Sequence, residues 1–420
     1  MKVCVIGSGG REHALAWRLS ISPSVTKVYA IPGSAAMSDC AELVGIDWQQ
    51  SDHLIRFLKD NYVDLVVVGP EAPLVAGLAD VLNKAGIPVF GPSKAAAQLE
   101  GSKVFAKDLM KKYNIPTAAY GVFHKVDEAK EFISQTSAPI VVKADGLAAG
   151  KGVVVAMTIE EANAAVEDML SENRFGEAGS TVVIEEFMEG EEASLLAFVD
   201  GKTVVPMIAS QDHKRIFDGD KGPNTGGMGT YAPAPVLTDA LRDEAMKTIL
   251  EPMVAAMQKE GMPYVGCLYA GLMITPQGPK VVEFNARFGD PETQVVLPLL
   301  DSDLGQIMMA CATGTLTADM VKWKDSSAAC VILASKGYPE TSSKGDVIHG
   351  DIKQHDTTIV FHSGTKLVGE EYVTNGGRVL GVVGLGKDLR TALDRAYGRI
   401  EHINFEGMQY RTDIGAKAFK

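Results

Sequence analysis

The first hundred residues alternate short apolar runs with amphipathic segments, and this alternation constrains the fold more than any other feature. The apolar runs are rich in Val and Ile and almost unbroken, as in KVCVIG at residues 2–7 and LVVVG at 65–69. Strands that are apolar on both faces are typical of parallel sheets covered by helices. The sequence therefore predicts an N-terminal, doubly wound parallel sheet, with one of its helices at residues 73–86. The carboxyl edge of such a sheet is where ligands bind.

The pattern changes further along the chain. A length of 420 residues suggests about two to four domains. After the first sheet comes a smaller α+β pattern, and residues 211–235 then form a polar, glycine-rich stretch that we expect to be a functional or disordered loop. A helix is expected from Asp239 to Gly261, and a separate small α/β module from about Ser326.

Composition excludes several classes of protein. The net charge of −13 disfavours a protein that coats nucleic acid, because such proteins carry a basic face. The five cysteines are scattered without a C-x-x-C pair, which indicates free thiols in a reducing compartment. We find no signal peptide and no apolar stretch long enough to cross a bilayer. We therefore expect a soluble, cytoplasmic protein, a monomer or weak dimer, with neither nucleic acid nor a membrane as partner.

The motif GSGGREHA at residues 7–14 joins the first strand to the first helix. Its glycines bring backbone N–H groups together, which suits either a tight turn or a phosphate of a small ligand. A dinucleotide fingerprint requires a further glycine where Glu12 stands and an acidic residue closing the second strand, and KVYAIP supplies none. An NAD-linked oxidoreductase is therefore disfavoured.

A second glycine-rich motif, VVKADGLAAGKGVVV at residues 141–155, joins two apolar strands. It is not a Walker A loop, because Gly146 and Gly150 are too close and Gly152 replaces the Ser or Thr. A lysine, Lys143, at the base of a flexible loop suits a polyphosphate, although an ordinary hairpin fits equally well. The carboxylates of EEFMEGEE at 185–192 follow another apolar strand and fit either a solvated strand end or a nucleotide slot.

The stretch VVEFNARFGDPETQ at residues 281–294 places polar groups inside an apolar strand. Glu283 and Asn285 are two residues apart, so both point to one face of the strand. Two oxygen donors on one face suit Mg²⁺ completed by substrate phosphates. Arg287 suits a carboxylate or a phosphoryl group in transfer. Together with Lys143 and its glycine loop, this set predicts a nucleotide-using active site.

Taken together, these motifs resemble the ATP-grasp superfamily and, within it, the glycinamide ribonucleotide synthetase family. The similarity covers essentially the whole chain and runs through GSGGREHA, GPEAPL, GLAAGKGV, EEFMEGEEAS, QDHKRIFDGDKGPNTGGMG, EFNARFGDPETQ and YRTDIG. The resemblance implies an N-terminal pre-ATP-grasp domain at 1–102, an ATP-grasp domain at 103–325 with a lid at about 119–188, and a C-terminal domain at 326–420. It also implies a carbon–nitrogen ligase of purine biosynthesis. In that reaction ATP activates glycine as glycyl phosphate, and 5-phosphoribosylamine displaces phosphate to give glycinamide ribonucleotide, ADP and Pi.

The resemblance also assigns roles to residues of this chain. Lys103 and Lys143 contact the ATP phosphates, and Gly150 and Gly152 belong to the closing loop. Glu185 holds adenine with the backbone of Phe187 and Met188, and Glu192 holds the ribose. Mg²⁺ or Mn²⁺ binds to Glu283 and Asn285. Substrate positions are Gly9, Gly10, Glu71, Asp212, Lys214, Asn224, Thr225, Gly226 and Arg287, and catalytic roles fall to Arg287, Lys143 and Asp212.

One departure concerns the metal. Many superfamily members carry a further acidic ligand on the preceding strand, where this chain reads YAGLMI at residues 269–274. Two other readings remain: an ATP-grasp ligase that uses formate or bicarbonate, and a nucleotide-binding regulator without turnover. The loop at 211–229 disfavours the first, and the joint presence of Lys143, Glu283 and Arg287 disfavours the second.

Overall fold

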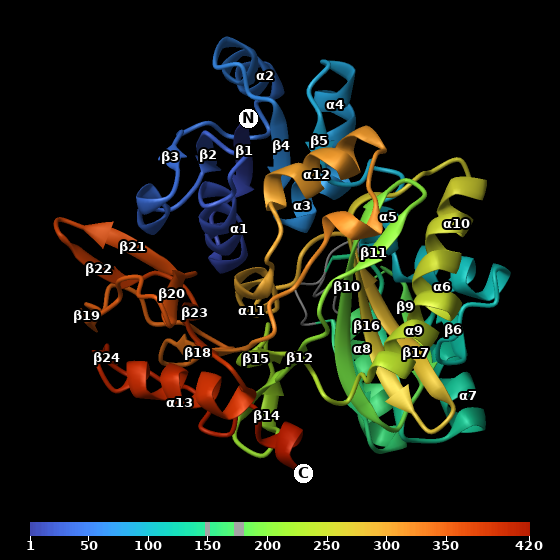
Figure 1. Cartoon of the computed structure of the whole chain (residues 1–420). Helices are drawn as coiled ribbons and strands as arrows, with labels where there is room; N and C mark the ends of the chain where they lie inside the picture. The colour runs from blue at the N-terminus through green and yellow to red at the C-terminus, as the bar shows by residue number, and fades with distance from the viewer. Residues whose placement is uncertain (148–151, 172–179) are drawn as a thin grey trace.

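The computed structural model describes residues 1–147, 152–171 and 180–420 (Figure 1). Its N-terminal sheet has the order β3-β2-β1-β4-β5 with all neighbours parallel, which confirms the predicted fold. The strands are β1 (Lys2–Gly7), β2 (Lys27–Pro32), β3 (Glu42–Leu43), β4 (Leu65–Val68) and β5 (Val89–Phe90). The helices are α1 (Gly10–Ser20), η1 (Ala35–Asp39), α2 (Ser51–Asp60), α3 (Glu71–Ala76) and α4 (Leu78–Lys84).

The single helix expected at residues 73–86 was wrong, since α3 and α4 are separate. Gly77 divides them with a φ of 95°, a left-handed conformation that glycine adopts without strain. The apolar periodicity continues across this break, because both helices pack against the same core, and so periodicity alone did not reveal it.

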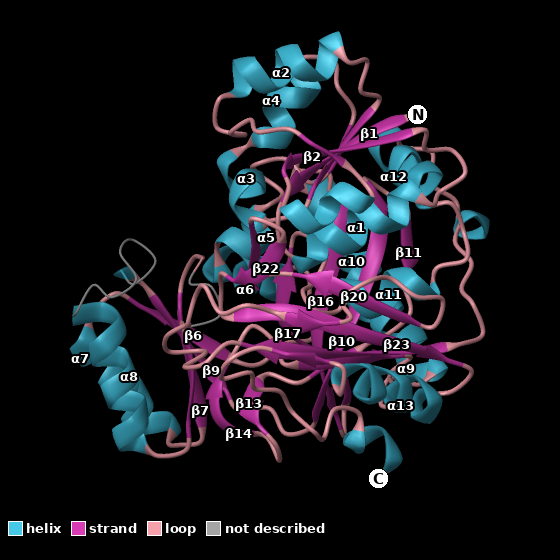
Figure 2. Cartoon of the chain, turned by 90° about the vertical axis from the view of Figure 1, so that its left-hand side faces the viewer, coloured by secondary structure: helices cyan, strands magenta, loops and turns pink. Residues whose placement is uncertain are grey.

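A small sheet has the order β6-β9-β7-β8, and we call this sheet with its helices, between Tyr120 and Glu186, the lid. Its strands are β6 (Tyr120–Phe123), β7 (Ile140–Ala144), β8 (Val153–Ala156) and β9 (Val182–Glu186), and its helices are α7 (Val126–Thr136) and α8 (Ile159–Ser171). The lid has a hydrophobic cluster of its own, which includes Ile133, Val142 and Ile184. Figure 2 shows α7 and α8 at the left, away from the N-terminal sheet. The lid is therefore packed as a separate body.

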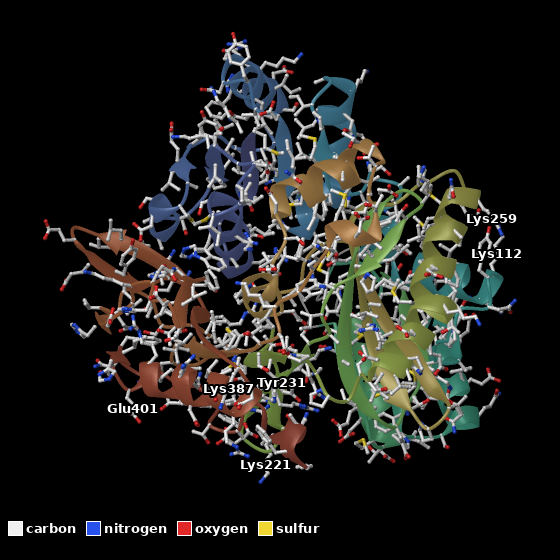
Figure 3. The ribbon with its side chains drawn as sticks, in the orientation of Figure 1. Lys112, Lys221, Tyr231, Lys259, Lys387 and Glu401 are labelled. Atoms are coloured by element: carbon white, nitrogen blue, oxygen red, sulfur yellow. The ribbon has the colours of Figure 1, made fainter. Side chains whose placement is uncertain are left out.

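The central sheet has the order β11-β10-β16-β17 and lies beside the lid. Its strands are β10 (Glu191–Asp200), β11 (Val204–Pro206), β16 (Val265–Thr275) and β17 (Gly278–Asn285). The surrounding helices are α5 (Gln98–Gly101), α6 (Lys103–Lys112), α9 (Asp239–Ala245), the π-helix η3 (Met246–Leu250), α10 (Glu251–Lys259), α11 (Thr293–Val296), η4 (Leu297–Leu299), α12 (Leu304–Thr313) and η5 (Ala318–Met320). Lys112 on α6 and Lys259 on α10 lie side by side (Figure 3). Their Nζ atoms are 5.6 and 5.7 Å, respectively, from the centroid of the Tyr113 ring.

The third sheet has the order β12-β15-β18-β23-β20 and combines distant parts of the chain. Its strands are β12 (Gln211–Asp212), β15 (Gly229–Ala232), β18 (Ser327–Ala334), β20 (Thr358–His362) and β23 (Arg378–Gly386), covered by α13 (Leu389–Ile400). Smaller pairs are β13 (Arg215–Phe217) with β14 (Lys221–Asn224), β19 (His349–Gly350) with β24 (Ile403–Asn404), and β21 (Thr365–Val368) with β22 (Glu371–Thr374), before η6 (Ala416–Phe419).

The expectation of one long loop at residues 211–235 was therefore wrong, because this stretch contributes four short strands. These strands are two to four residues long, which is too short to show an alternating apolar pattern. The five cysteines are free thiols, as predicted. No helix in the described part of the chain is long and apolar enough to cross a membrane.

Candidate active site

Lys143, near the end of β7 in the lid, and Lys107, on α6, share the carboxylate of Glu185. Nζ of Lys143 lies 3.0 Å from Oε1 of Glu185 and donates to the carbonyl oxygen of Val282 at 3.1 Å. Nζ of Lys107 lies 3.1 Å from Oε2 of Glu185 and 2.7 Å from Oγ1 of Thr117. The three charged side chains are buried. The cluster therefore connects a core helix to two lid strands.

Lys107 was missed in the sequence. Burial lowers its pKa to about 8, although the charge of Glu185 opposes this shift. It lies one helical turn after Lys103, and side chains four residues apart share a helix face. This spacing was an available signal that Lys107 accompanies a predicted phosphate-binding lysine.

Lys103 lies at the N-terminus of α6, beside the base of the glycine loop. Its Nζ donates to the carbonyl oxygen of Gly146 at 3.0 Å. Oδ1 of Asp145 accepts from the backbone N–H groups of Lys103 and Val104 at 2.6 and 3.2 Å. A carboxylate at this position also complements the helix dipole. Burial lowers the pKa of Lys103, and the charge of Glu283 opposes this shift.

The rest of the glycine loop is described only in part. Gly150 lies outside the described residues. Gly152 precedes β8, and its carbonyl oxygen accepts from the N–H of Ala144 at 2.8 Å. The two strands that flank the loop are antiparallel neighbours, with Lys143 opposite Val153. The two flanking strands that the sequence predicted are therefore present.

Glu283 and Asn285 share one face of β17, as alternate strand positions must. Nδ2 of Asn285 lies 3.5 Å from Oε1 of Glu283. On the neighbouring β16 the residue opposite Glu283 is Gly271, so the adjoining strand presents no side chain beside the carboxylate. Burial raises the pKa of Glu283, but surrounding cations, among which Lys214 and Lys143 act most strongly, outweigh burial and leave this pKa below its ordinary value. The amide oxygen of Asn285 accepts from Nη2 of Arg287 at 3.4 Å. An ionised carboxylate and an amide oxygen on one strand face are donor types that Mg²⁺ prefers.

Arg287 links this strand to the N-terminal domain. Its Nη2 lies 2.8 Å from Oε1 of Glu100, and its Nε donates to Oε2 of Glu71 at 3.2 Å. Oε2 of Glu100 also accepts from the N–H of Ala286 at 2.7 Å. Burial lowers the pKa of Arg287, but Glu100 and then Glu71 outweigh it and raise this pKa above its ordinary value. Glu100 is a second residue that sequence reasoning missed.

The turn after β1 is occupied by the side chain of Glu12. Its Oε2 accepts from the N–H of Gly9 at 2.8 Å, and its Oε1 lies 2.6 Å from Nε of Arg11. A Cβ atom on Gly7 would lie 2.4 Å from Cγ of Glu12. A Cβ on Gly10 would lie 2.3 Å from Oγ of Ser363, so the C-terminal domain closely approaches the start of α1.

Two carboxylates interact electrostatically near the predicted substrate loop: the half-buried Asp212 on β12 and the buried Glu292, which immediately precedes α11. Burial, and then the charge of Glu292, raise the pKa of Asp212 well above its ordinary value, whereas Lys214 opposes this shift. Oε1 of Glu292 accepts from the hydroxyl of Tyr269 at 2.7 Å and from Oγ of Ser194 at 3.3 Å. Such a pair attracts a cationic group, because a positive charge would relieve the repulsion between the two acids.

The predicted substrate loop closes beside this pair. Nζ of Lys214 lies 2.9 Å from Oε2 of Glu192. A residue expected to bind glycine therefore contacts a residue expected to bind the ribose of ATP. The N–H of Thr225 donates to the carbonyl oxygen of Lys214 at 2.7 Å. Nη1 of Arg378 donates to the carbonyl oxygen of Gly226 at 2.9 Å. Arg378 was missed because it lies far along the chain, outside every motif that the sequence suggested.

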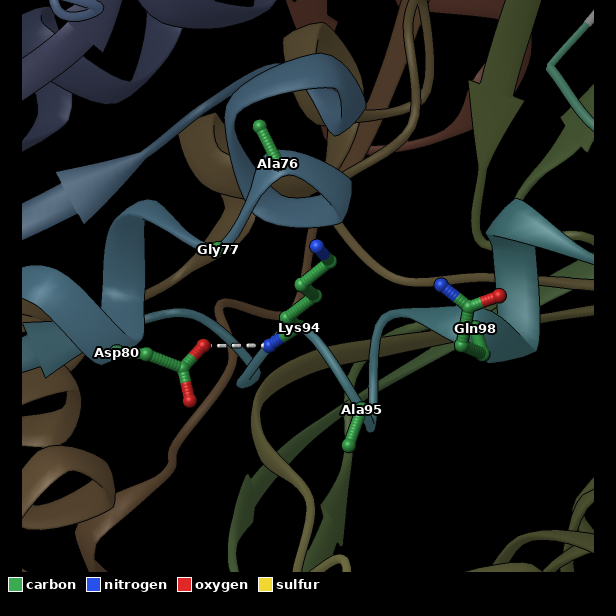
Figure 4. Close-up of a pocket in the computed structure, with 6 residues that line it drawn as sticks. All are labelled: Ala76, Gly77, Asp80, Lys94, Ala95 and Gln98. Atoms are coloured by element: carbon green, nitrogen blue, oxygen red, sulfur yellow. Dashed lines mark hydrogen bonds between the residues drawn. The ribbon is translucent and has the colours of Figure 1, made fainter.

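A hollow of about 830 Å³ lies where the lid meets the central sheet. It is lined by residues 185–189, by the turn at 275–277 and by side chains of the lid, and it includes Phe187 and Met188. A second hollow, of about 520 Å³, lies between the α3–α4 break and residues 94–98, where the N–H of Lys94 donates to Oδ2 of Asp80 at 2.7 Å (Figure 4). The second hollow contains no predicted site residue.

Comparison with known proteins agrees with this geometry. Three family models match successive parts of the chain: the phosphoribosylglycinamide synthetase N domain at residues 1–100, its ATP-grasp (A) domain at 101–293 and its C domain at 328–417. The chain belongs to the phosphoribosylglycinamide synthetase family. The resemblance inferred from the motifs is thereby confirmed.

Relatives in this family are similar over their whole length. The phosphoribosylamine–glycine ligase of Halalkalibacterium halodurans is 53% identical over 418 residues, which cover 100% of this chain and 97% of that protein. The ligase of Neisseria meningitidis serogroup A is 53% identical over 420 residues, covering 100% and 99%. The crystal structure of the Thermotoga maritima phosphoribosylamine–glycine ligase has a TM-score of 0.86 at 34% identity and covers 99% of this chain and 100% of that one.

The wider ATP-grasp fold is visible in more distant structures. The biotin carboxylase domain of a Hydrogenobacter thermophilus 2-oxoglutarate carboxylase, solved with MgADP, ADP and bicarbonate, has a TM-score of 0.75 at 17% identity and covers 97% of this chain and 91% of that one. At this identity the likeness concerns the fold alone. As a member of the phosphoribosylglycinamide synthetase family, with its ATP-grasp domain, the chain is an ATP-using ligase.

Proposed function

We propose that the protein joins glycine to 5-phosphoribosylamine in purine biosynthesis. The glycine carboxylate attacks the γ-phosphorus of ATP and releases ADP, which gives glycyl phosphate. The amine of phosphoribosylamine then attacks the acyl carbon, loses a proton and expels phosphate. The new amide bond is that of glycinamide ribonucleotide. Activation is needed because a free carboxylate is a poor acyl donor. The catalytic effect would come mostly from positioning and charge neutralisation.

The observation that carries this proposal is the convergence of three kinds of group. Phosphate-binding cations (Lys103 and Lys143) and oxygen donors (Glu283 and Asn285) would lie at one end of the central sheet. This is supported by the hydrogen bond from Lys143 to the carbonyl oxygen of Val282 and by the lysines that lower the pKa of Glu283. The acid pair that includes Asp212 lies beside the Lys214 loop. A site for ATP therefore adjoins a site suited to the ammonium group of an amino acid.

Each predicted residue keeps a role in the proposal. Lys103, Lys143, Gly150 and Gly152 neutralise and enclose the ATP phosphates, Glu185, Phe187 and Met188 border the adenine, and Glu192 borders the ribose. Arg287 orients the transferring phosphoryl group and the acyl phosphate. Asp212, Lys214, Asn224, Thr225 and Gly226 hold glycine and the acceptor, and Gly9, Gly10 and Glu71 hold the phosphoribosyl group.

Glu283 and Asn285 would hold Mg²⁺ or Mn²⁺, with phosphate and water as further ligands, and the ion would neutralise charge on the ATP phosphates. We further propose a cytoplasmic enzyme, a monomer or weak dimer, that acts on small molecules and needs neither nucleic acid nor a membrane. The burial of four of its five free thiols is compatible with a reducing compartment.

The test is release of ADP and phosphate by the purified protein with ATP and Mg²⁺. Glycine and freshly generated 5-phosphoribosylamine are added separately and together. Release that requires both supports the proposal. Release with formate or bicarbonate and another ribonucleotide instead would retain the ATP-grasp mechanism and replace the substrates, and no release with any carboxylate would favour a regulator without turnover.

A further inference from the structure

Near the end of the chain, the motif YRTDIG carries a deeply buried charge that the proposed reaction does not use. Arg411 is only 1% exposed. Its Nε lies 2.7 Å from Oδ1 of Asp413 and its Nη2 lies 2.8 Å from Oδ2, which is a bidentate pair. Its Nη1 donates to Oδ1 of Asp220 at 2.9 Å and to the carbonyl oxygen of Arg215 at 3.1 Å. All three guanidinium nitrogens therefore have partners.

Asp220 and Arg215 belong to the β13–β14 hairpin, so Arg411 joins this hairpin to the end of the chain. Figure 1 shows β14 beside the C-terminus, and Figure 3 shows Lys221 of the hairpin below Tyr231. Further contacts join the same segments: Thr412 N–H to Asp218 Oδ1 at 2.8 Å, Gly219 N–H to Asp413 Oδ2 at 2.9 Å, and Lys417 Nζ to Asp220 Oδ2 at 2.8 Å.

The hairpin separates two groups of proposed substrate residues. Lys214 directly precedes it, and Asn224 ends it opposite Arg215. Both the N–H and Oγ1 of Thr225 donate to the carbonyl oxygen of Lys214, at 2.7 and 2.8 Å. These two bonds close the base of the hairpin. Among the strands that the structure describes, β13 and β14 pair only with each other, with an irregular register. A two-stranded hairpin is marginally stable alone, so its position depends on outside contacts.

The charges at the hairpin tip make Arg411 the decisive contact. Burial raises the pKa of Asp413, but hydrogen bonds from Arg411 and the N–H of Gly219 outweigh it, so this pKa is lowered. The pKa of Asp220 is also lowered, because hydrogen bonds from Lys417 and Arg411 outweigh burial. Without the guanidinium, ionised carboxylates would face one another at a partly buried site, and the tip would separate from the end of the chain.

We propose that residues 411–413 form a clamp that positions the β13–β14 hairpin, and through it Lys214 and residues 224–226, for glycine and phosphoribosylamine. Arg411 is the positioning residue of this clamp and touches neither substrate. The inference rests on the proposed function for the identity of the substrates. It adds the requirement that residues near the C-terminus hold the β13–β14 hairpin in place.

The test compares Arg411→Met with the unaltered protein. We expect the KM for glycine and for phosphoribosylamine to rise by about tenfold or more, as for loss of a charged hydrogen bond, while the KM for ATP changes less than about twofold. Trypsin should also cleave faster after the exposed Lys221, because the tip is released. A general loss of stability would instead reduce the fraction of active enzyme, and so lower the apparent kcat without a selective change in any KM.

Arg399→Met is the matched control. Arg399 is also an arginine of the C-terminal region with a carboxylate partner, Asp351 at 2.8 Å, but it is half-buried, and Asp351 and Lys353, which it contacts, lie outside the hairpin. This variant should leave all three KM values unchanged.

If Arg411→Met fails to fold, Asp220→Asn at the half-exposed tip decides the question, with a smaller rise in the same two KM values. Unchanged glycine and phosphoribosylamine KM values, or equal effects in Arg411→Met and Arg399→Met, would overturn the clamp. Absence of glycine-dependent ADP release by the unaltered protein would instead overturn the proposed function.

Discussion

At the base of the lid, one carboxylate contacts two buried lysines, and burial makes the charge of Lys107 sensitive to pH. The folded-state pKa of Lys107, about 8, lies below that of an unfolded lysine, about 10.4. Between these values the folded chain binds fewer protons, so this group makes folding more favourable as pH rises through the window. The ammonium that holds Glu185, however, is lost above about pH 8.

We therefore expect kcat/KM for ATP to fall as pH rises through about 8. Lys107→Arg should move this fall to higher pH, because a guanidinium stays protonated. Lys107→Met should lower kcat/KM for ATP by about 10- to 100-fold at neutral pH, since Glu185 would keep one cation only. The measurement is the pH profile of initial rates at limiting ATP. An identical alkaline limb in Lys107→Arg would assign it to another group.

A second prediction at this scale concerns the proposed metal site. Glu283→Gln keeps the size of the side chain but removes the negative charge that Lys214 and Lys143 stabilise. We expect an unchanged fold by circular dichroism and loss of Mg²⁺-dependent turnover. Lys143→Ala is the comparison, and it should weaken ATP binding and turnover together. Full activity of Glu283→Gln would remove this residue from the metal site.

Single residues also show what a sequence can reveal about a site. The two-residue spacing of Glu283 and Asn285 fixed their common face, because side chains alternate along any strand. No local rule brings Arg378 to Gly226 or Arg411 to Asp220, since these contacts join segments more than a hundred residues apart. Such partners become visible only when the topology is known.

At the scale of elements, Gly190 joins lid strand β9 to central strand β10. Its φ is 152°, and a Cβ atom there would lie 2.2 Å from the carbonyl oxygen of Ile274. Gly190→Ala should lower the free energy of unfolding by about 1–3 kcal/mol through backbone strain, with further loss from the clash. It should also raise the KM for ATP, because the linker sets the lid against the β16–β17 hairpin.

Gly261→Ala is the control for this linker. Gly261 also has a positive φ, 76°, but nothing lies within 4 Å of a Cβ atom at that position. It should lose about 1–2 kcal/mol from the backbone term alone and leave the KM for ATP unchanged. Thermal unfolding and ATP kinetics of the two variants separate strain from contact. Equal losses in both, with no change in KM, would contradict a role of the linker in placing the lid.

Elements differ in how well the sequence predicted them. The parallel sheet was recognisable because β1 and β4 are buried on both faces and give nearly unbroken apolar runs. The helix expected from Asp239 to Gly261 is present as α9, η3 and α10, since a π-turn does not interrupt an amphipathic pattern. The strands between Gln211 and Ala232 could not be foreseen, because each has only two to four residues and β15 depends on long-range pairing with β18.

At the scale of the whole molecule, the lid is distinguished by how its core is organised. One hydrophobic cluster runs continuously through all three sheets outside the lid and includes Leu58, Leu272 and Val382. The cluster that contains Ile133 and Ile184 belongs to the lid alone. Apart from the backbone, the lid is tied to the core by polar contacts such as those of Glu185 and Asp145. Opening of the lid therefore exposes less apolar surface than global unfolding does.

We predict that amide hydrogens of β7 and β9 exchange faster than those of β16 and β18, because local opening of the lid leaves the larger clusters intact. ADP with Mg²⁺ should slow exchange in the lid strands selectively, since a ligand that binds across lid and core stabilises the closed arrangement. Hydrogen exchange followed by mass spectrometry, with and without nucleotide, measures both effects. Lys107→Met should reduce the nucleotide-dependent protection, whereas Arg399→Met should not. Exchange at one common rate in all four strands would show that the lid and core unfold as a single cooperative unit, despite their separate hydrophobic clusters.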